Sequence, residues 1–169
     1  MQIANYNVMK KYKMIGNIAG YNDGMFLAMD GTEKKYGNVG MNVRFNQINT
    51  NNKYGETPIV TYAFSPCFGS GTKPVEVNDY DMDKVNTDIS IAGASAIGSP
   101  DRESQYMASF AIVVENKKDY PITLSEIGLF SANSTSSWDK SQIVLLYREV
   151  FDPVTIQPGE AFTFTINFK

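Results

Sequence analysis

The strongest constraint on the fold is a two-residue alternation of apolar and polar side chains in the last third of the chain. It is clearest in residues 161–168, where Phe162, Phe164, Ile166 and Phe168 alternate with threonine and asparagine. Successive side chains of a β-strand point to opposite faces, so this pattern predicts a strand whose phenylalanines face the core. Strands of the same kind are predicted in three earlier segments, 106–116, 122–130 and 142–151.

Local signals refine these strands. The segment 142–151, QIVLLYREVF, is apolar on both faces and is predicted to be a central strand that ends at Asp152-Pro153. Gly128, inside an apolar segment, indicates a bulge or a close backbone approach. Asp30-Gly31 predicts a tight turn, because glycine accepts a positive φ.

Turn-forming residues set the rest of the predicted organisation. Residues 67–104 are rich in glycine, proline and serine and are predicted to be mostly irregular, after a strand at 59–66 that stops at Pro66. Short strands without helical periodicity predict an all-β chain, an antiparallel β-sandwich of jelly-roll or immunoglobulin-like type with long loops. Residues 1–35 are predicted to be an N-terminal arm or edge segment, and residues 36–169 the sandwich domain.

Composition excludes several classes of function. The chain has no histidine, one cysteine (Cys67) and a net charge of −3 at pH 7. The commonest general base and zinc ligand are therefore missing, and one cysteine cannot form an intrachain disulfide. The basic footprint of nucleic-acid binding is lacking, and no apolar run reaches the ~18 residues of a membrane helix. We therefore expect no cofactor, no nucleic-acid partner and no membrane partner.

An acidic motif is the one candidate for a metal site. Asp79, Asp81 and Asp83 have the first three spacings of a calcium-binding loop. The pattern then requires glycine and glutamate, where Lys84 and Ser90 stand. A solvated acidic loop is the favoured interpretation, with the three aspartates as a weak metal candidate only.

Two glutamates lie within apolar strands. Paired carboxylates can hydrolyse glycosides, but a lone glutamate in a strand is more often an outward-facing or edge residue that opposes aggregation. Glu126 and Glu149 are given this role, with Arg148 and Arg44 as available partners. The chain is therefore predicted not to be an enzyme.

Long polar loops supply the candidate contact surfaces. Segments 67–88 and 131–141 are predicted to make contacts rather than core, because long loops in compact domains are usually functional or disordered. The only tryptophan, Trp138, could stack on a sugar, anchor an interface or pack back onto the sheet. The interface candidates are Trp138, Asp79, Tyr80 and Met82.

Several phrases in a fixed order resemble those of bacteriophage virion proteins found especially in gut phages. The first is GSGTKPVEVNDYDMD (69–83), followed by EIGLF, then an L-L-x-R-x-V-F-x-P-V-x-I-x-P-G-E run, and finally T-I-x-F. Residues 1–60 are not covered by the resemblance. The matching residues are Gly69, Ser70, Gly71, Pro74, Asp79, Tyr80, Met82, 126–130, 145–151, 158–160 and 165–168.

This resemblance implies a non-enzymatic structural subunit of the phage particle, foremost a tail or neck ring component at the head–tail connector. The alternatives are a capsid-surface decoration or head-fibre protein, and a carbohydrate- or receptor-binding β-module used in adsorption. Sheet edges that need covering further predict a cyclic homo-oligomer, with residues 1–35 crossing to an adjacent subunit. The expected partners are copies of the chain and other virion proteins, and the expected location is the virion, after synthesis in the host bacterial cytoplasm.

Overall fold

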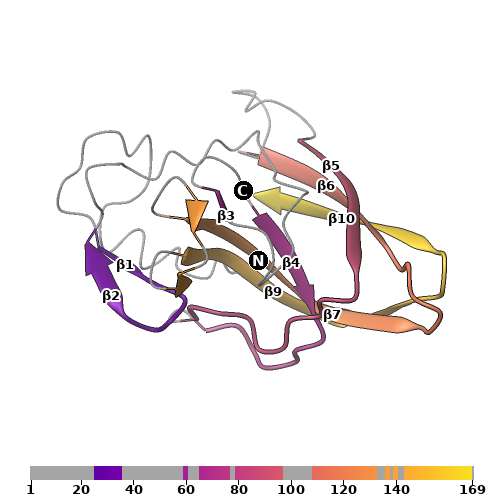
Figure 1. Ribbon diagram of the computed structural model, residues 1–169, viewed down its shortest axis with the longest axis horizontal. Coiled ribbons are helices and arrows are strands. Elements are labelled where there is room, and N and C mark those ends of the chain that lie inside the picture. Colours follow the sequence, from indigo (N-terminus) through magenta and orange to yellow (C-terminus); the bar gives the residue numbers. More distant parts are fainter. Residues whose placement is uncertain are drawn as a thin grey trace.

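The structure, a computed structural model, describes residues 25–35, 59–60, 65–76, 79–96, 108–132, 136–137, 139–140 and 143–168. These residues form strands and turns, without an α-helix among them (Figure 1). The expected all-β class with antiparallel sheets is confirmed for this part of the chain. The strands are β1 (Met25–Leu27), β2 (Glu33–Lys35), β3 (Ile59–Val60), β4 (Ser65–Gly69), β5 (Ser90–Ala96), β6 (Ala108–Glu115), β7 (Ile122–Ala132), β8 (Ser136–Ser137), β9 (Ile143–Ile156) and β10 (Ala161–Phe168).

The first of two three-stranded sheets has the order β4-β7-β9, so β7 is its central strand. The prediction that segment 142–151 is a central strand is not met among the described strands, where β9 pairs only with β7. Its residues 143–148 are nevertheless all buried. They are apolar on both faces because Val144 and Leu146 join one core cluster while Ile143 and Leu145 join another.

The β7–β9 ladder is irregular where β9 contains a proline. Between the pairs formed by Val150 and Val154, three residues of β9 lie opposite Ser125 alone. Pro153 has no N–H to donate to a ladder, which accounts for an irregularity at this point. Asp152-Pro153 was predicted to end the strand, but β9 continues through it to Ile156.

The second sheet has the order β10-β6-β5, with β6 in the centre. β10 pairs with β6 over its full length, from Ala161 opposite Glu115 to Phe168 opposite Ala108. The turn before β10 uses Gly159, whose φ is 76°. The shorter pairing of β5 with β6 contains a bulge between Ile91 and Gly93.

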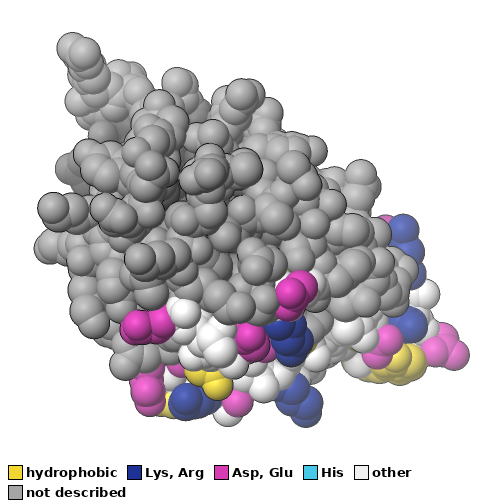
Figure 2. Space-filling view, turned by 60° about the vertical axis from the view of Figure 1, so that its left-hand side comes forward, with side chains coloured by type: hydrophobic (Ala, Val, Ile, Leu, Met, Phe, Trp, Pro, Cys, Tyr) yellow, Lys and Arg dark blue, Asp and Glu magenta, His cyan; other side chains and the backbone are white. Residues whose placement is uncertain are grey.

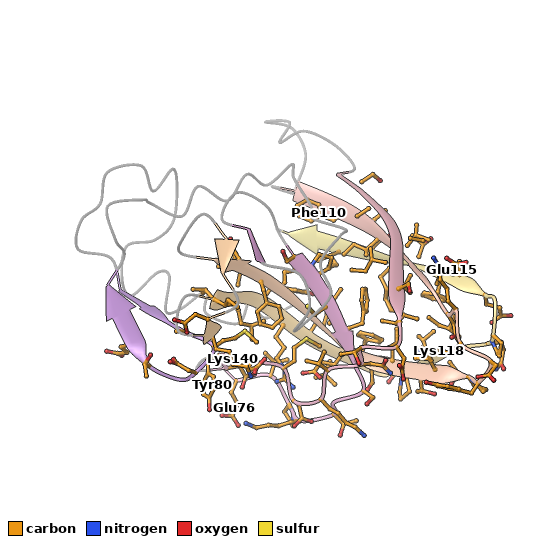
Figure 3. All side chains as sticks on the ribbon, in the orientation of Figure 1. Glu76, Tyr80, Phe110, Glu115, Lys118 and Lys140 are labelled. Atoms are coloured by element: carbon orange, nitrogen blue, oxygen red, sulfur yellow. The ribbon has the colours of Figure 1, made fainter. Side chains whose placement is uncertain are left out.

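Both sheets contribute to one hydrophobic core. Its main cluster includes Phe110 and Ile112 of β6, Leu124 and Leu129 of β7 and Phe68 of β4, each at most 1% exposed. Figure 3 shows side chains of both sheets in the space between them, among them Phe110. A smaller cluster contains Met29, Cys67, Met82, Phe130, Ile143 and Leu145.

Two short pairings complete the described fold. The Asp30-Gly31 turn joins β1 to β2 as predicted, with φ of 80° at Gly31 and Asp30 accepting a hydrogen bond from the Thr32 N–H at 2.9 Å. β3 pairs with β8. The hairpin is attached to the first sheet because the Met29 N–H donates to the Ile143 carbonyl at 2.9 Å.

Residues 67–104 contain more regular structure than expected. β4 does not stop at Pro66 but runs through it to Gly69, and β5 occupies Ser90–Ala96. All five residues of β4 are buried. The sequence did not predict this buried strand, because the glycines and proline of the segment are equally typical of a loop.

Candidate functional site

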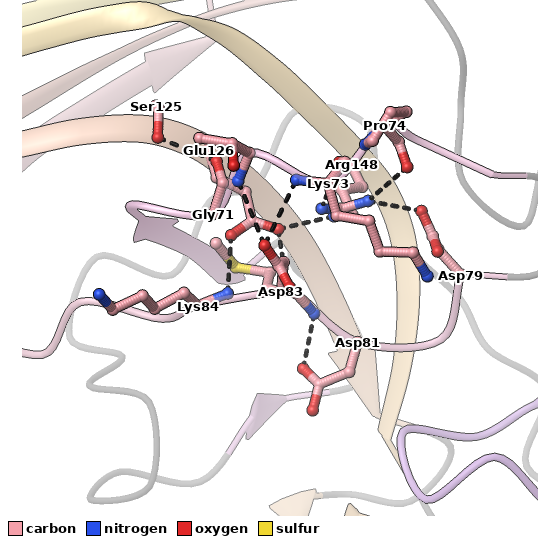
Figure 4. Close-up of polar contacts among 12 residues, drawn as sticks. Gly71, Lys73, Pro74, Asp79, Asp81, Asp83, Lys84, Ser125, Glu126 and Arg148 are labelled. Atoms are coloured by element: carbon pink, nitrogen blue, oxygen red, sulfur yellow. Dashed lines mark hydrogen bonds and ion pairs between the residues drawn. The ribbon is translucent and has the colours of Figure 1, made fainter.

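The main polar feature is a buried network that attaches the loop 70–85 to β7 and β9 (Figure 4). We call it the Arg148 network and define it by Arg148 of β9, Glu126 of β7 and Asp79 of the loop. The side chains of Arg148, Glu126 and Asp79 are 1%, 0% and 9% exposed. Three charged groups at this depth require compensation from one another and from backbone groups.

Glu126 accepts hydrogen bonds from both the loop and the neighbouring strand. Its Oε1 accepts from the Asp83 N–H at 2.7 Å and from Nε of Arg148 at 2.6 Å. Its Oε2 accepts from the Lys84 N–H at 3.1 Å. The prediction that Glu126 is an edge or outward-facing residue is wrong, because β7 is the central strand and the loop covers this point.

Arg148 links three parts of the chain through separate nitrogens. Nε donates to Glu126, one terminal nitrogen donates to Oδ2 of Asp79 at 2.7 Å, and the other donates to the Lys73 carbonyl at 3.0 Å. Burial works against the cation, but the hydrogen bonds that Arg148 donates to Glu126 and Asp79 outweigh it and raise the pKa of Arg148 above its ordinary value. The guanidinium is therefore charged at neutral pH.

Asp79 completes the charge balance. Besides Arg148, its Oδ2 accepts from the Glu76 N–H at 2.8 Å. Two carboxylates and one guanidinium carry a formal charge of −1, which three loop N–H groups offset. Fixed N–H donors thus take the place that water would have around these buried carboxylates.

Two glycines allow the loop to lie close to the Glu126 carboxylate. A Cβ on Gly69 would overlap the Lys84 carbonyl oxygen and lie 2.7 Å from Oε2 of Glu126. A Cβ on Gly71 would overlap the same carboxylate oxygen and approach Cβ of Asp83 to 2.6 Å. Ser125 donates to the Gly71 carbonyl at 2.9 Å from the adjacent position of β7. The glycines of GSG are therefore required by contact with a buried carboxylate.

The loop is also bound along the outer side of β4. The Ser70 N–H donates to the Lys84 carbonyl at 2.8 Å, the Asn86 N–H donates to the Phe68 carbonyl at 2.8 Å, and Gly69 forms an isolated antiparallel bridge with Val85. Segment 67–88, predicted to be a contact surface rather than core, is thus partly core and partly a tightly attached loop.

The aspartates of the calcium-like motif have separate partners. Asp79 binds Arg148, Asp81 forms an ion pair with Lys140 at 3.5 Å, and Asp83 accepts from the N–H groups of Thr72 and Lys73. Among the described residues no group of three His, Cys, Asp or Glu side chains could hold a metal ion. The sequence spacing therefore does not bring the three carboxylates together.

The interface candidates divide by burial. Met82 is 7% exposed in the smaller core cluster, where its Cγ and Sδ would each lie 2.9 Å from a Cβ on Gly128. This is the close approach that Gly128 indicated. Asp79 is buried in the network, so neither Met82 nor Asp79 is available at the surface. Tyr80, between them, is 43% exposed with its ring against Gly31, while Trp138 lies outside the described residues.

The pairing of Glu126 with Arg148 had a sequence signal, two opposite charges each within an apolar strand. Glu126 is opposite Val150 and Gly128 is opposite Arg148, so the two charges are diagonal neighbours on adjacent strands. Asp79 as the second carboxylate had no such signal. It is 69 residues from Arg148, in an acidic stretch that a solvated loop explains equally well. Arg44, the other partner considered, lies outside the described residues.

A second, exposed cluster joins β5 to the β6–β7 turn. The Tyr120 hydroxyl donates to Asp88 at 2.7 Å, and Lys118 forms an ion pair with Asp88 at 3.0 Å. The hydrogen bond from Tyr120, followed by the interaction with Lys118, lowers the pKa of Asp88. The bond to Asp88 raises the pKa of Tyr120 and of Lys118.

Charges of both signs are mixed over the described surface. In Figure 2, Lys and Arg side chains lie among Asp and Glu side chains on the described part of this face. Exposed ion pairs of this kind each contribute little to stability. Within the described segments there is no helix long and apolar enough to cross a membrane.

Comparisons with protein-family models, curated proteins and solved structures found no match to the chain. The functional interpretation therefore depends on the residues and their contacts.

Proposed function

We propose that the chain is a non-enzymatic structural subunit of a bacteriophage particle, foremost a tail or neck ring component at the head–tail connector. The observation that carries the proposal is that the phrases resembling virion proteins meet in one place. Gly71, Pro74 and Asp79 come from the first phrase, Glu126 from the second and Arg148 from the third. Arg148 donates to Glu126, to Asp79 and to the Pro74 carbonyl, and Gly71 lies against the Glu126 carboxylate (Figure 4).

This convergence gives the resemblance a physical basis. Each phrase alone is ordinary turn or strand chemistry. Together they specify a loop attached to two strands by a buried ion pair, which needs glycine next to a carboxylate and an arginine on the adjacent strand. The separate phrases between residues 69 and 148 then all contribute to one buried contact. This supports a common fold with those virion proteins.

For the architecture we propose an antiparallel β-sandwich of jelly-roll or immunoglobulin-like type. Two sheets that bury their facing residues in one cluster support it. Of the arm predicted at residues 1–35, residues 1–24 lie outside the described part of the chain, and Ala28 and Met29 in the β1–β2 turn are 0% and 3% exposed. The proposal of a cyclic homo-oligomer in the virion, with the N-terminal segment crossing to an adjacent subunit, therefore continues to depend on the sequence.

The role of the network in this function is to hold a contact loop rigid. The loop presents Tyr80 at the surface. On either side of Tyr80 the loop is held in place, by the bond of Asp79 to Arg148 and by the buried side chain of Met82. A tyrosine on an already ordered loop binds a partner with little further loss of conformational entropy. Tyr80 is thus the described interface candidate that we retain, and Trp138 stays a candidate from the sequence.

The test is mass spectrometry of purified particles, with the copy number taken from densitometry. Six or twelve copies of the chain per particle would support a neck or tail ring, because such rings are closed cyclic assemblies. Hundreds of copies would instead favour capsid decoration, and a few copies at a fibre tip would favour the receptor-binding alternative. Absence of the chain from purified particles would refute the virion role altogether.

A further inference from the structure

The two three-stranded sheets end in four outer strands among the described residues: β4 and β9 in one sheet, and β5 and β10 in the other. An outer strand exposes N–H and C=O groups that can pair with another chain. Proteins that stay monomeric protect such edges with bulges, charges, prolines or a covering loop. Three of these four edges have such a device.

The first sheet is protected on both sides. β4 contains Pro66, and residues 84–86 cover its outer side through the hydrogen bonds of Ser70 and Asn86. β9 contains Arg148, whose side chain points into the buried network, and Asp152-Pro153 at its irregularity. Neither strand offers a continuous straight edge to a second chain.

In the second sheet, β5 is protected by the bulge between Ile91 and Gly93. A bulge twists an edge away from a straight partner. Its sequence, SIAGASA, is also mostly alanine, glycine and serine, which favour strands weakly.

Within the described segments, β10 has none of these protections. Its sequence AFTFTINF has no charge, no proline and no glycine, and all eight residues pair with β6 without a register shift. Thr163 and Thr165 are exposed, and Phe162 is 40% exposed. Uncharged alternating segments of this length without proline are those that most readily add another strand.

The backbone groups that face outward on β10 follow from its pairing with β6. The Asn116 N–H donates to the Glu160 carbonyl at 3.0 Å, so Glu160 is at a hydrogen-bonded position. Such positions alternate along an antiparallel ladder, which directs the N–H and C=O groups of Phe162, Phe164 and Ile166 toward β6. The corresponding groups of Thr163 and Thr165 therefore point away from the sheet.

We propose that β10 pairs antiparallel with β10 of a second copy of this chain, joining the two three-stranded sheets across a twofold axis. The edge of β10 carries no charge that would repel an identical strand, and the alternation of β10 is complementary to itself. Because the outward groups belong to odd-numbered residues in both copies, Thr163 of one copy lies opposite Thr163 or Thr165 of the other. In either register the phenylalanines of both copies share one face.

This face explains an otherwise exposed aromatic side chain. The ring centroids of Phe162 and Phe164 are 4.8 Å apart, and Phe164 lies 4.8 Å from the buried Phe68. The row of rings thus leads from the core to the exposed Phe162 at the start of β10. The prediction that the phenylalanine ladder of this strand is mostly core holds in part: Phe164 is half-buried against the core, whereas Phe162 is 40% exposed and would be covered by a second copy. The side chain of Phe168 lies outside the described residues. The inference stands on β10 alone and does not require the virion role.

The experiment measures the mass of the purified full-length chain by size-exclusion chromatography with light scattering, over a range of concentrations. The chain of 18.8 kDa is expected to form a species of 2 × 18.8 = 37.6 kDa. Thr163→Pro removes an outward N–H in each copy and leaves the bonds to β6 unchanged. Two lost hydrogen bonds should raise the dissociation constant about 30-fold. Thr163→Val, which keeps the N–H, is the matched control and should dimerise normally.

Two further variants keep the test decisive if proline disturbs the fold. Thr163→Lys retains the N–H but brings like charges together across the axis, and should give monomer with an unchanged circular dichroism spectrum. A Thr163→Cys and Thr165→Cys double variant should form an intermolecular disulfide in either register, since the Cα separation across strands suits a disulfide. Ser95→Cys, exposed on β5, should not. A chain that is monomeric at every concentration, or a dimer that Thr163→Lys leaves unchanged, would overturn the proposal.

Discussion

Replacing Arg148 with methionine tests the Arg148 network most directly. Methionine fills much of the same volume without the charge or the donors. The change removes the bonds to Glu126 at 2.6 Å, to Asp79 at 2.7 Å and to the Lys73 carbonyl at 3.0 Å. Two carboxylates then remain buried without their cation.

The expected cost follows from burial rather than from the number of bonds. Removing one partner of a buried ion pair costs about 3–5 kcal/mol, because the remaining charge is uncompensated. A loss of 1 kcal/mol lowers the melting temperature by about 2–4 °C in a chain of this size, so Arg148→Met should lower it by roughly 6–20 °C.

The assay is urea unfolding at pH 7, with Lys73→Met as the matched control. Lys73 lies on the same loop and its side chain is exposed, so its removal changes the net charge equally but leaves the network intact. We expect the control to change the free energy of unfolding by less than about 0.5 kcal/mol.

A double-mutant cycle with Glu126→Gln separates the pair from other effects of each change. The cost of the double variant should be about 1–3 kcal/mol less than the sum of the single costs, as for contacting residues in one network. The network does not hold the loop if Arg148→Met lowers the free energy of unfolding by less than about 1 kcal/mol. The same conclusion follows if the losses of the two single variants add up to the loss of the double variant.

Three further predictions follow from the described contacts. Gly71→Ala should destabilise the fold by about 1–3 kcal/mol, because its Cβ would overlap the Glu126 carboxylate. Gly93→Ala is the control and should not destabilise the fold, because nothing lies within 4 Å of its Cβ. Urea unfolding of both variants measures the difference. Thermal melts in calcium and in chelator should coincide, and a shift above about 4 °C, equivalent to ~1 kcal/mol, would contradict the separate partners of the loop aspartates. The wild-type protein should be stabilised by Asp88 at pH values above the usual Asp pKa of 3.8, and should lose this stabilisation as the pH falls through the lowered pKa of Asp88. Asp88→Asn should remove this stabilisation. Melting temperatures of both proteins across this pH range measure the difference.

The sequence by itself determined the class of the fold. Alternation with period two in β6, β7 and β10 predicted antiparallel strands, and the Asp30-Gly31 turn was predicted from its dipeptide. These are local properties: a strand with one buried face has to alternate, and a tight turn needs a residue that accepts positive φ.

Only the tertiary structure decided which strand is central and which charges are buried. β9 is apolar on both faces because it lies between two core clusters, a property that a central strand shares. Glu126 and Asp79 have the sequence surroundings of an exposed residue and a solvated loop. Arg148 and the loop N–H groups that make their burial tolerable come from distant positions in the chain. Burial of a charge depends on partners brought together by folding, so no local pattern of residues can express it.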